Sequence, residues 1–140
     1  MILILTLLLS TTQTPGNDDL TGYWEDEDKE SLIHIYKENG KFYGKMIDVY
    51  NPYWEDGRKK IDEYNPKPEL RKRPFEGIIL LLDLEWNGEE FVNGKIYNPV
   101  NGKTYSCQGK MDGMDTFNLR GYIGFSIIGQ TTTWTRKRQK

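Results

Sequence analysis

The sequence predicts an all-β domain, a small antiparallel up-and-down barrel of about eight strands with one long irregular loop. Two features favour it: turn dipeptides recur along the chain, and stretches rich in aromatic and β-branched residues lie between them. Asn-Gly and Asp-Gly suit the two-residue type I′ turn, because both of its central residues need a positive φ. The turn dipeptides are Asn39-Gly40, Asn87-Gly88, Asn101-Gly102 and Asp112-Gly113.

The composition argues against several classes of protein. The formal net charge is −2, which gives no electrostatic basis for binding nucleic acid. The one cysteine, Cys107, permits no intramolecular disulfide, and together with the one histidine it cannot supply the three or four ligands of a Cys/His zinc site. The spaced acidic loop of an EF-hand is absent, although counting leaves a carboxylate-only calcium site open. We predict no metal and no cofactor.

Residues 1–16 resemble a secretory signal peptide. The segment from Ile2 to Leu9 is almost entirely aliphatic, a small polar stretch follows, and Pro15-Gly16 ends it. The apolar run is far too short to cross a bilayer as a helix, which takes about 20 residues. No Lys or Arg precedes the run and no Ala-x-Ala site follows it, so a buried N-terminal strand is the alternative. No cysteine for a lipid anchor follows it either. We expect removal of this leader and an extracytoplasmic location, periplasmic or secreted.

After a linker over residues 17–20, one barrel domain is predicted over residues 21–137. Its first strand opens at Thr21 to Trp24, and a first hairpin joins Ser31–Glu38 to Lys41–Tyr50 through Asn39-Gly40. A two-residue turn pairs Tyr36 with Tyr43, Ile35 with Gly44 and Ile33 with Met46. Because side chains alternate along a strand, one face is predicted to point inward. That face consists of Ile33, Ile35, Phe42, Gly44 and Met46.

Residues 51–74 break the hairpin pattern. They hold four of the six prolines and the basic cluster Arg71-Lys72-Arg73, with one short strand predicted near Arg58 to Asp62. Loops of this length in small domains are often functional. We call residues 53–74 the long loop. Its basic cluster could contact an anionic partner, and a solvated loop is the alternative.

Five further strands complete the predicted barrel. The most hydrophobic of them is expected to be a buried strand rather than a helix, because Gly77 precedes it and Asn87-Gly88 follows it. The strands are predicted over Phe75–Trp86, Phe91–Tyr97, Thr104–Lys110, Met114–Arg120 and Gln130–Arg136, with a bend over Gly121–Gly129. Two-residue turns would pair Tyr97 with Ser106, Ile96 with Cys107, Gln108 with Phe117 and Ser106 with Leu119.

Both ends of the domain resemble the calycin pattern that lipocalins, fatty-acid-binding proteins and avidins share. The motifs that carry this resemblance are Gly22-Tyr23-Trp24 and Thr133-Trp134-Thr135-Arg136. It implies that the indole of Trp24 lies across the closed end of the barrel and that a basic residue packs over it. Arg136 is the first candidate for that residue and Arg120 the second. A cation over an aromatic face contributes about 0.5–2 kcal/mol.

Residues 21–137 are also similar to a bacterial family catalogued as domain of unknown function 2147. The similarity is carried, in order, by Gly22-Tyr23-Trp24, Ile35-Tyr36, Gly40-Lys41-Phe42-Tyr43-Gly44-Lys45, Gly94-Lys95-Ile96-Tyr97-Asn98-Pro99, Asn101-Gly102-Lys103-Thr104-Tyr105, Arg120-Gly121-Tyr122-Ile123-Gly124 and Trp134-Thr135-Arg136. This resemblance implies a small exported β-barrel and brings no activity. Many members carry two nearby cysteines in the long loop, and here that loop has none.

No catalytic constellation is visible, so we predict that the protein is not an enzyme. Gly-x-Ser-x-Gly, P-loop and Gly-x-Gly-x-x-Gly motifs are absent. His34 is expected on the outer face beside Lys45 as a structural residue, and Cys107 as a small buried thiol. A Cys–His nucleophilic pair and the carboxylate pair Asp83 and Glu85 are the alternatives.

The predicted function is that of an exported binding module, which holds a small apolar or amphipathic ligand or a cell-envelope component in the mouth of the barrel. Tyrosine suits a wet cavity, because it offers a flat apolar body and a hydroxyl group. Ordinary strand packing is the alternative for these side chains. The candidate ligand-binding residues are Tyr36, Tyr43, Tyr97, Tyr105, Tyr122 and Trp134. The alternative function is a filled barrel that contacts another protein through the long loop.

Overall fold

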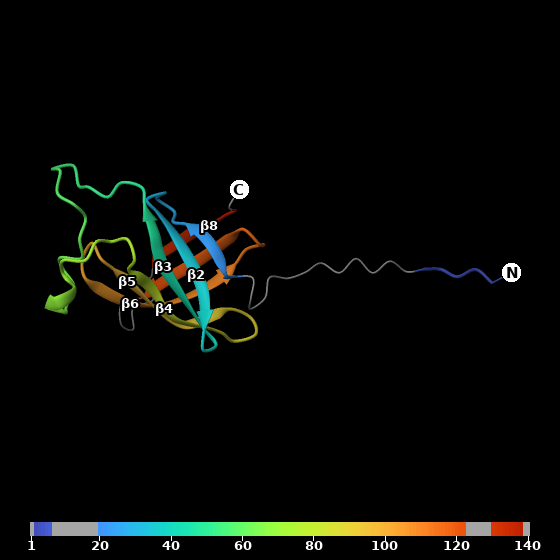
Figure 1. Ribbon diagram of the computed structural model, residues 1–140. Coiled ribbons are helices and arrows are strands. Elements are labelled where there is room, and N and C mark those ends of the chain that lie inside the picture. The colour runs from blue at the N-terminus through green and yellow to red at the C-terminus, as the bar shows by residue number, and fades with distance from the viewer. Residues whose placement is uncertain (1, 7–19, 123–129, 139–140) are drawn as a thin grey trace.

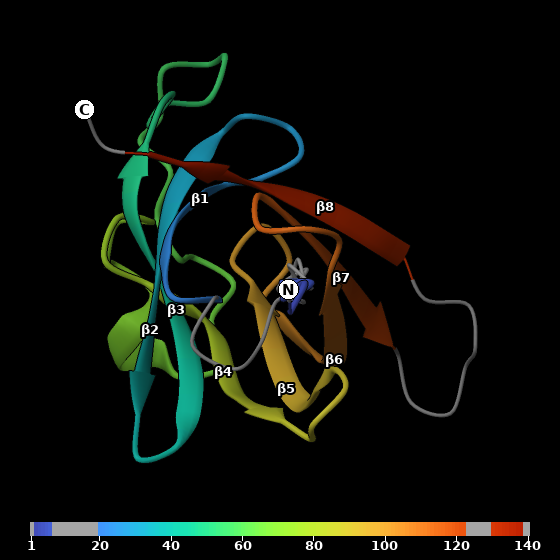
Figure 2. The same ribbon diagram turned by 90° about the vertical axis from the view of Figure 1, so that its right-hand side faces the viewer.

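The computed structural model describes residues 2–6, 20–122 and 130–138. Within them, eight strands form a closed antiparallel barrel in which each strand pairs with its sequence neighbours and β8 pairs with β1 (Figures 1 and 2). The strands are β1 (Gly22–Glu25), β2 (Ser31–Glu38), β3 (Lys41–Val49), β4 (Ile79–Trp86), β5 (Phe91–Asn98), β6 (Lys103–Met111), β7 (Thr116–Tyr122) and β8 (Gln130–Lys137). The predicted all-β, up-and-down barrel is therefore confirmed.

The first hairpin forms as predicted. Tyr36 faces Tyr43 across β2 and β3, Ile35 faces Gly44, and Ile33 faces Met46. The turn is of type I′, since Asn39 and Gly40 have φ angles of 51° and 78°. The predicted inner face of Ile33, Ile35, Phe42, Gly44 and Met46 is buried.

The predicted register between β5 and β6 is wrong. Asn98 pairs with Lys103, so Tyr97 faces Thr104 and Ile96 faces Tyr105, instead of Ser106 and Cys107. The connection is longer than a two-residue turn, because the Gly102 amide donates to the Asn98 carbonyl at 2.8 Å. Unlike Asn39, Asn101 does not take a positive φ.

The predicted register between β6 and β7 is wrong as well. Phe117 faces Met111 instead of Gln108, and Leu119 faces Gly109 instead of Ser106. The phenyl ring of Phe117 occupies the space where a Cβ of Gly109 would lie, so packing inside the barrel fixes this alignment. The longer connection is closed by a hydrogen bond of 2.9 Å from the Asp112 amide to the Thr116 carbonyl.

The connection from β3 to β4 contains the long loop and is ordered without forming a strand. The strand expected near Arg58 to Asp62 is replaced by two isolated bridges, Tyr53 with Lys59 and Ile61 with Pro74. A 3₁₀ turn, η2, spans Pro68–Leu70. The strand expected from Phe75 begins only at Ile79. Most of the bend expected over residues 121–129 lies outside the described residues.

The two ends of the barrel differ. The turn at residues 39–40 and the connections at 87–90 and 112–115 lie at one end, which we call the closed end. The connections at 26–30, 50–78 and 99–102 lie at the other, the open end. Aromatic rings fill the closed end: Phe117 lies 6.0 Å from Trp24, 5.8 Å from Phe91 and 6.2 Å from Trp134, and Phe91 lies 5.3 Å from Phe42. This half of the interior is therefore a packed core.

Candidate functional site

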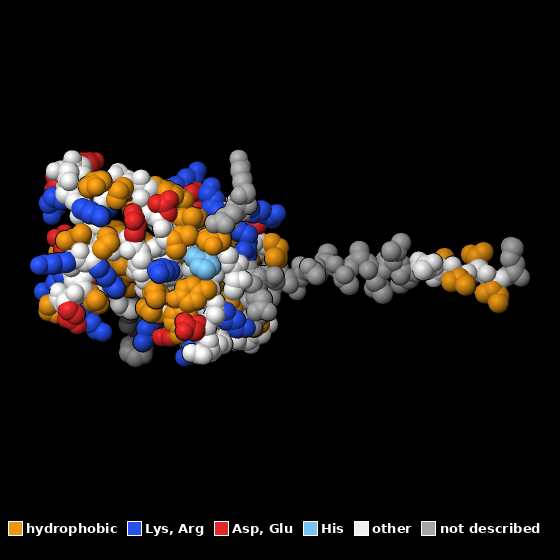
Figure 3. All heavy atoms as spheres, in the orientation of Figure 1, with side chains coloured by type: hydrophobic (Ala, Val, Ile, Leu, Met, Phe, Trp, Pro, Cys, Tyr) orange, Lys and Arg blue, Asp and Glu red, His pale blue; other side chains and the backbone are white. Residues whose placement is uncertain are grey.

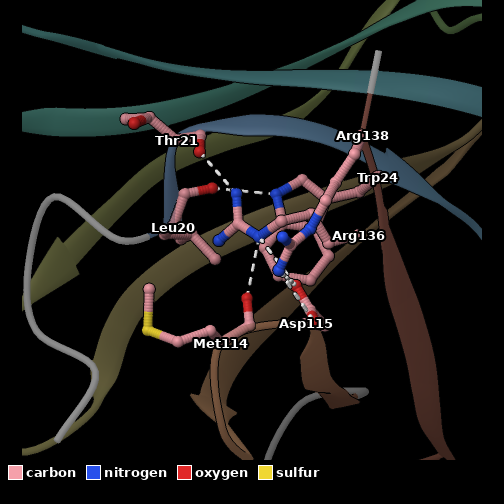
Figure 4. A network of polar contacts seen from close by, with 7 residues as sticks. All are labelled: Leu20, Thr21, Trp24, Met114, Asp115, Arg136 and Arg138. Atoms are coloured by element: carbon pink, nitrogen blue, oxygen red, sulfur yellow. Dashed lines mark hydrogen bonds and ion pairs between the residues drawn. The ribbon is translucent and has the colours of Figure 1, made fainter. Parts of the chain in front are cut away.

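The closed end is sealed by an arginine stacked on a buried indole (Figure 4). Trp24 is fully buried, and its Nε1–H donates to the Leu20 carbonyl at 2.8 Å. The guanidinium carbon of Arg136 lies 4.4 Å from the centre of the Trp24 ring. Arg136 also donates from Nη1 to the Thr21 carbonyl at 2.8 Å and from Nε to the Met114 carbonyl at 2.7 Å. One side chain thus connects β8 to the start of β1 and to the β6–β7 connection.

Two further residues shape this seal. Gly22 has a φ of +132°, and a Cβ at that position would lie 2.8 Å from Nη1 of Arg136, so a larger residue would displace the guanidinium. Asp115 lies 3.7 Å from Nε of Arg136 and 3.2 Å from Nη2 of Arg138. Arg120, the second candidate for the stacked cation, instead sits in the middle of β7, where it pairs with Gln108 and Thr131.

The six candidate ligand-binding residues do not meet in one place. Tyr36 and Tyr43 lie on the outer face of β2 and β3, with ring centres 5.8 Å apart. The Tyr43 hydroxyl donates to Asp83 at 2.9 Å. The ring of His34 lies next to these tyrosines on the same outer face. Its centre is 5.7 Å from that of Tyr36, and it stacks on the ring of Tyr23 with 4.7 Å between the centres. These tyrosines point away from the interior because their strand neighbours fill it.

Tyr97 lies beneath the long loop, where it binds a buried carboxylate. Asp62 is fully buried, and one of its oxygens accepts a hydrogen bond of 2.5 Å from the Tyr97 hydroxyl. The other accepts from Nδ2 of Asn65 and from Nε of Arg73, both at 2.8 Å. Burial, and next the hydrogen bond to Asp62, raises the pKa of Tyr97 to about 12. We call these four residues the loop latch.

The latch was not predicted, and the only local sign of it was an acidic residue beside Ile61 in an otherwise polar segment. A second contact joins the same loop to the barrel. Trp54 packs edge-on against Phe75 at 6.3 Å, with Nζ of Lys60 4.8 Å from the indole centre. A shallow surface depression at this contact is lined by Val49, Pro52, Lys59, Lys60, Pro74, Phe75 and Glu76.

The inner wall near the open end is less covered than the rest. Ile96 faces Tyr105 across β5 and β6, and both are half-buried. Gly121, on β7, faces the buried Cys107, and a Cβ there would lie 3.7 Å from Cγ2 of Ile96 and 3.8 Å from Cβ of Tyr105. The Tyr105 hydroxyl accepts a hydrogen bond of 2.9 Å from Nδ2 of Asn101. We call Ile96, Tyr105 and Gly121 the open-end wall.

The two remaining candidates, Trp134 and Tyr122, lie at opposite ends of the barrel. Trp134 is buried in the aromatic core of the closed end, against Phe117. Tyr122 ends β7 at the open end, and its side chain lies outside the described part of the chain. Among the predicted ligand-binding residues, Tyr105 is therefore the one placed on the open-end wall.

Residues 22–136 match the family described as an uncharacterized protein conserved in bacteria, DUF2147. The chain belongs to this family. Among solved structures, protein HP1028 from the human pathogen Helicobacter pylori, described as belonging to the lipocalin family, is similar to it with a TM-score of 0.72 and 31% sequence identity. The similarity covers 85% of this chain and 83% of that one, so this DUF2147 barrel has a lipocalin-like fold. No curated protein matches the chain.

In this DUF2147 barrel the histidine and the cysteine that could have formed a nucleophilic pair lie apart. Cys107 is buried inside the wall of β6, whereas His34 lies on the outer face of β2, so the two do not form a pair. Within the described residues, no group of three or more His, Cys, Asp or Glu is placed to hold a metal ion. No helix among them is long and apolar enough to cross a membrane.

The thiol of Cys107 is expected to be inert in the folded protein. Burial raises its pKa from 9.0 to about 12, so it stays protonated at pH 8. We expect Ellman's reagent to label Cys107 at pH 8 only after denaturant is added. Because the pKa is raised on folding, this thiol's contribution to stability is complete below pH 9 and is lost as the pH rises toward about 12. Rapid stoichiometric labelling without denaturant would contradict an inert thiol. The Cys107→Ala variant, which has no thiol, gives the background signal of the reagent.

Proposed function

We propose that this protein binds a small apolar or amphipathic ligand at the open end of its barrel and catalyses no reaction. The observation that carries the proposal is the open-end wall. Inner-facing Ile96, Tyr105 and Gly121 remain partly exposed, whereas Trp24 and Phe117 at the other end are fully buried. The mouths of small barrels are common ligand sites, and the described relative belongs to the lipocalin family.

The packing limits the size and chemistry of this ligand. Aromatic rings already fill the closed half of the barrel, so the ligand is expected to occupy only the open half. Ile96 offers an apolar contact there, and the Tyr105 hydroxyl with the Asn101 amide offers a polar one. This pairing suits a compact molecule with one polar end.

We also propose that the protein is exported and loses its leader. Ile2, Leu3, Ile4 and Leu5 are 78–91% exposed, and four neighbouring aliphatic side chains without packing partners are unfavourable in a mature folded protein. They suit a segment that a signal peptidase removes. The mature protein is then expected in the periplasm or outside the cell.

Native mass spectrometry of the protein recovered from its own host tests both proposals. We expect a protein mass that lacks the leader, with an additional small molecule that dissociates on activation. A full-length mass in the cytoplasmic fraction would contradict export. A mature protein that carries nothing, and that does not bind a neutral apolar probe, would contradict ligand binding.

Filling the open-end wall should block the site. Gly121 does not need a positive φ, so Gly121→Leu introduces bulk beside Ile96 and Tyr105 without backbone strain. We expect the neutral probe N-phenyl-1-naphthylamine to bind this variant about tenfold more weakly than the wild type, a loss of about 1.4 kcal/mol. Thr131→Leu, on the outer side of β8, is the matched control and should bind normally. Equal fluorescence titrations for both variants would contradict the site.

A second candidate function is contact with another protein through the long loop. The packed interior favours it, since a filled barrel needs no ligand for its stability. The absence of probe binding together with an empty protein from the host would favour this candidate over the first.

A further inference from the structure

The long loop carries more basic than acidic residues, although the protein as a whole is slightly acidic. Between residues 53 and 74 the chain has seven Lys or Arg and five Asp or Glu, whereas the whole chain has a formal net charge of −2. Lys and Arg side chains lie along the side of the molecule that this loop forms, at the left of Figure 3. A positive surface of this kind attracts an anionic partner.

Ion pairs within this loop leave several of its lysines without a carboxylate partner. The Asp62 carboxylate is buried and bonded to Arg73, and Asp56 lies 2.7 Å from Arg58. In contrast, Lys59, Lys67 and Lys72 are exposed, and no carboxylate of the described chain lies within 4.0 Å of their amino groups. These three lysines are exposed charges available to a partner, beside the exposed Arg71, Glu55 and Glu69.

The same loop carries exposed aromatic side chains. Tyr53 is 52% exposed and Tyr64 is 59% exposed. Tyrosine is favoured at the boundary between a membrane and water, because its ring is apolar and its hydroxyl stays hydrated. Exposed lysines interspersed with exposed tyrosines therefore match the two layers of a lipid surface, charged headgroups above and acyl chains below.

The loop holds these groups in fixed positions. The latch at Asp62 ties it to Tyr97 on β5, and Nε of Arg71 donates to the Asn65 carbonyl at 2.7 Å. At Gly102 the β5–β6 connection approaches the Tyr64 backbone so closely that a Cβ would collide with it. A preorganised surface loses little conformational entropy on binding.

We propose that the long loop docks the barrel on an anionic lipid surface through Lys59, Lys67 and Lys72, with Tyr53 and Tyr64 at the headgroup level. A planar lipid surface fits this loop better than one folded partner, because lipid headgroups adapt to dispersed lysines without needing a complementary pocket. The β3–β4 connection lies at the open end, so docking turns that end toward the membrane. The inference does not depend on a ligand, and the two experiments can fail separately.

Co-sedimentation with vesicles tests the proposal. We expect the protein without its leader to sediment with vesicles of phosphatidylglycerol and phosphatidylcholine in equal parts, and to stay in solution with pure phosphatidylcholine. Raising the salt from 50 mM to 500 mM should release it, since screening weakens surface attraction. The triple variant Lys59→Glu, Lys67→Glu, Lys72→Glu should bind the anionic vesicles about 100-fold more weakly or worse.

The matched control is Lys45→Glu, Lys95→Glu, Lys110→Glu, which changes the net charge equally at exposed positions on the barrel wall. It should keep most of the binding, and circular dichroism should show that both triple variants are folded. Equal losses in the two variants would mean that net charge alone drives binding, and would overturn a docking surface on the loop. If the protein does not bind anionic vesicles, the lipid proposal is overturned. Binding to an acidic protein would not rescue it.

Discussion

Trp24→Ala is expected to lower the free energy of unfolding by about 3–5 kcal/mol, because it empties the centre of a packed aromatic core. The indole is fully buried and lies 6.0 Å from the ring of Phe117. Its removal also leaves the Leu20 carbonyl without the hydrogen bond from Nε1 and Arg136 without the ring beneath it. Chemical denaturation of the purified domain measures the loss.

A double-mutant cycle separates the stacking from the burial. Trp24→Leu keeps an apolar side chain but removes the aromatic face, and Arg136→Met keeps the stem but removes the charge and its hydrogen bonds. The coupling between the two changes is expected to be about 0.5–2 kcal/mol. Additive effects would show that Arg136 stabilises the closed end only through the Thr21 and Met114 carbonyls. A loss below about 1 kcal/mol in Trp24→Ala would contradict the whole account of the seal.

Asp62→Ala is expected to release the long loop from the barrel. The substitution leaves the Tyr97 hydroxyl, the Asn65 amide and the Arg73 guanidinium without their shared acceptor. Removing one partner of a buried ion pair costs about 3–5 kcal/mol, and the lower value applies here because Arg73 is partly exposed. About 3 kcal/mol corresponds to a roughly 150-fold larger open population.

Limited proteolysis reports on this release, because trypsin cleaves after the basic residues of the loop only when it opens. We expect cleavage at Arg71 and Lys72 to accelerate by about two orders of magnitude in Asp62→Ala. Tyr97→Phe removes one hydrogen bond and should accelerate it by about tenfold. Identical digestion rates in wild type and Asp62→Ala would show that the latch does not hold the loop.

Local sequence signals predicted the strands well and the pairing between them only in part. Asn39-Gly40 fixed the first hairpin because both residues take a positive φ. Asn101-Gly102 and Asp112-Gly113 carry the same signal, yet they sit in longer connections. For β6 and β7 the alignment follows from the packing of the Phe117 ring over Gly109 on the neighbouring strand, a contact that no dipeptide encodes.

The candidate sites divide in the same way. The contact between Trp24 and Arg136 was expected from the resemblance of the two ends of the chain to known barrels. Residue type alone did not predict where the six candidate aromatic residues lie, since Tyr36 and Tyr43 face outward while Trp134 lies in the core. The hydrogen bond between Tyr97 and Asp62 joins a strand to a loop, and the sequence around neither residue indicates its partner.

The seam between β1 and β8 has a consequence for how the molecule is made. Tyr23 faces Lys137 across it, so β1 gains its second neighbouring strand only when β8 is in place. A polypeptide that emerges with its N-terminus first therefore has two unpaired edge strands until β8 has been added. A copy truncated before β8 should self-associate, and holding such intermediates apart becomes a task for chaperones.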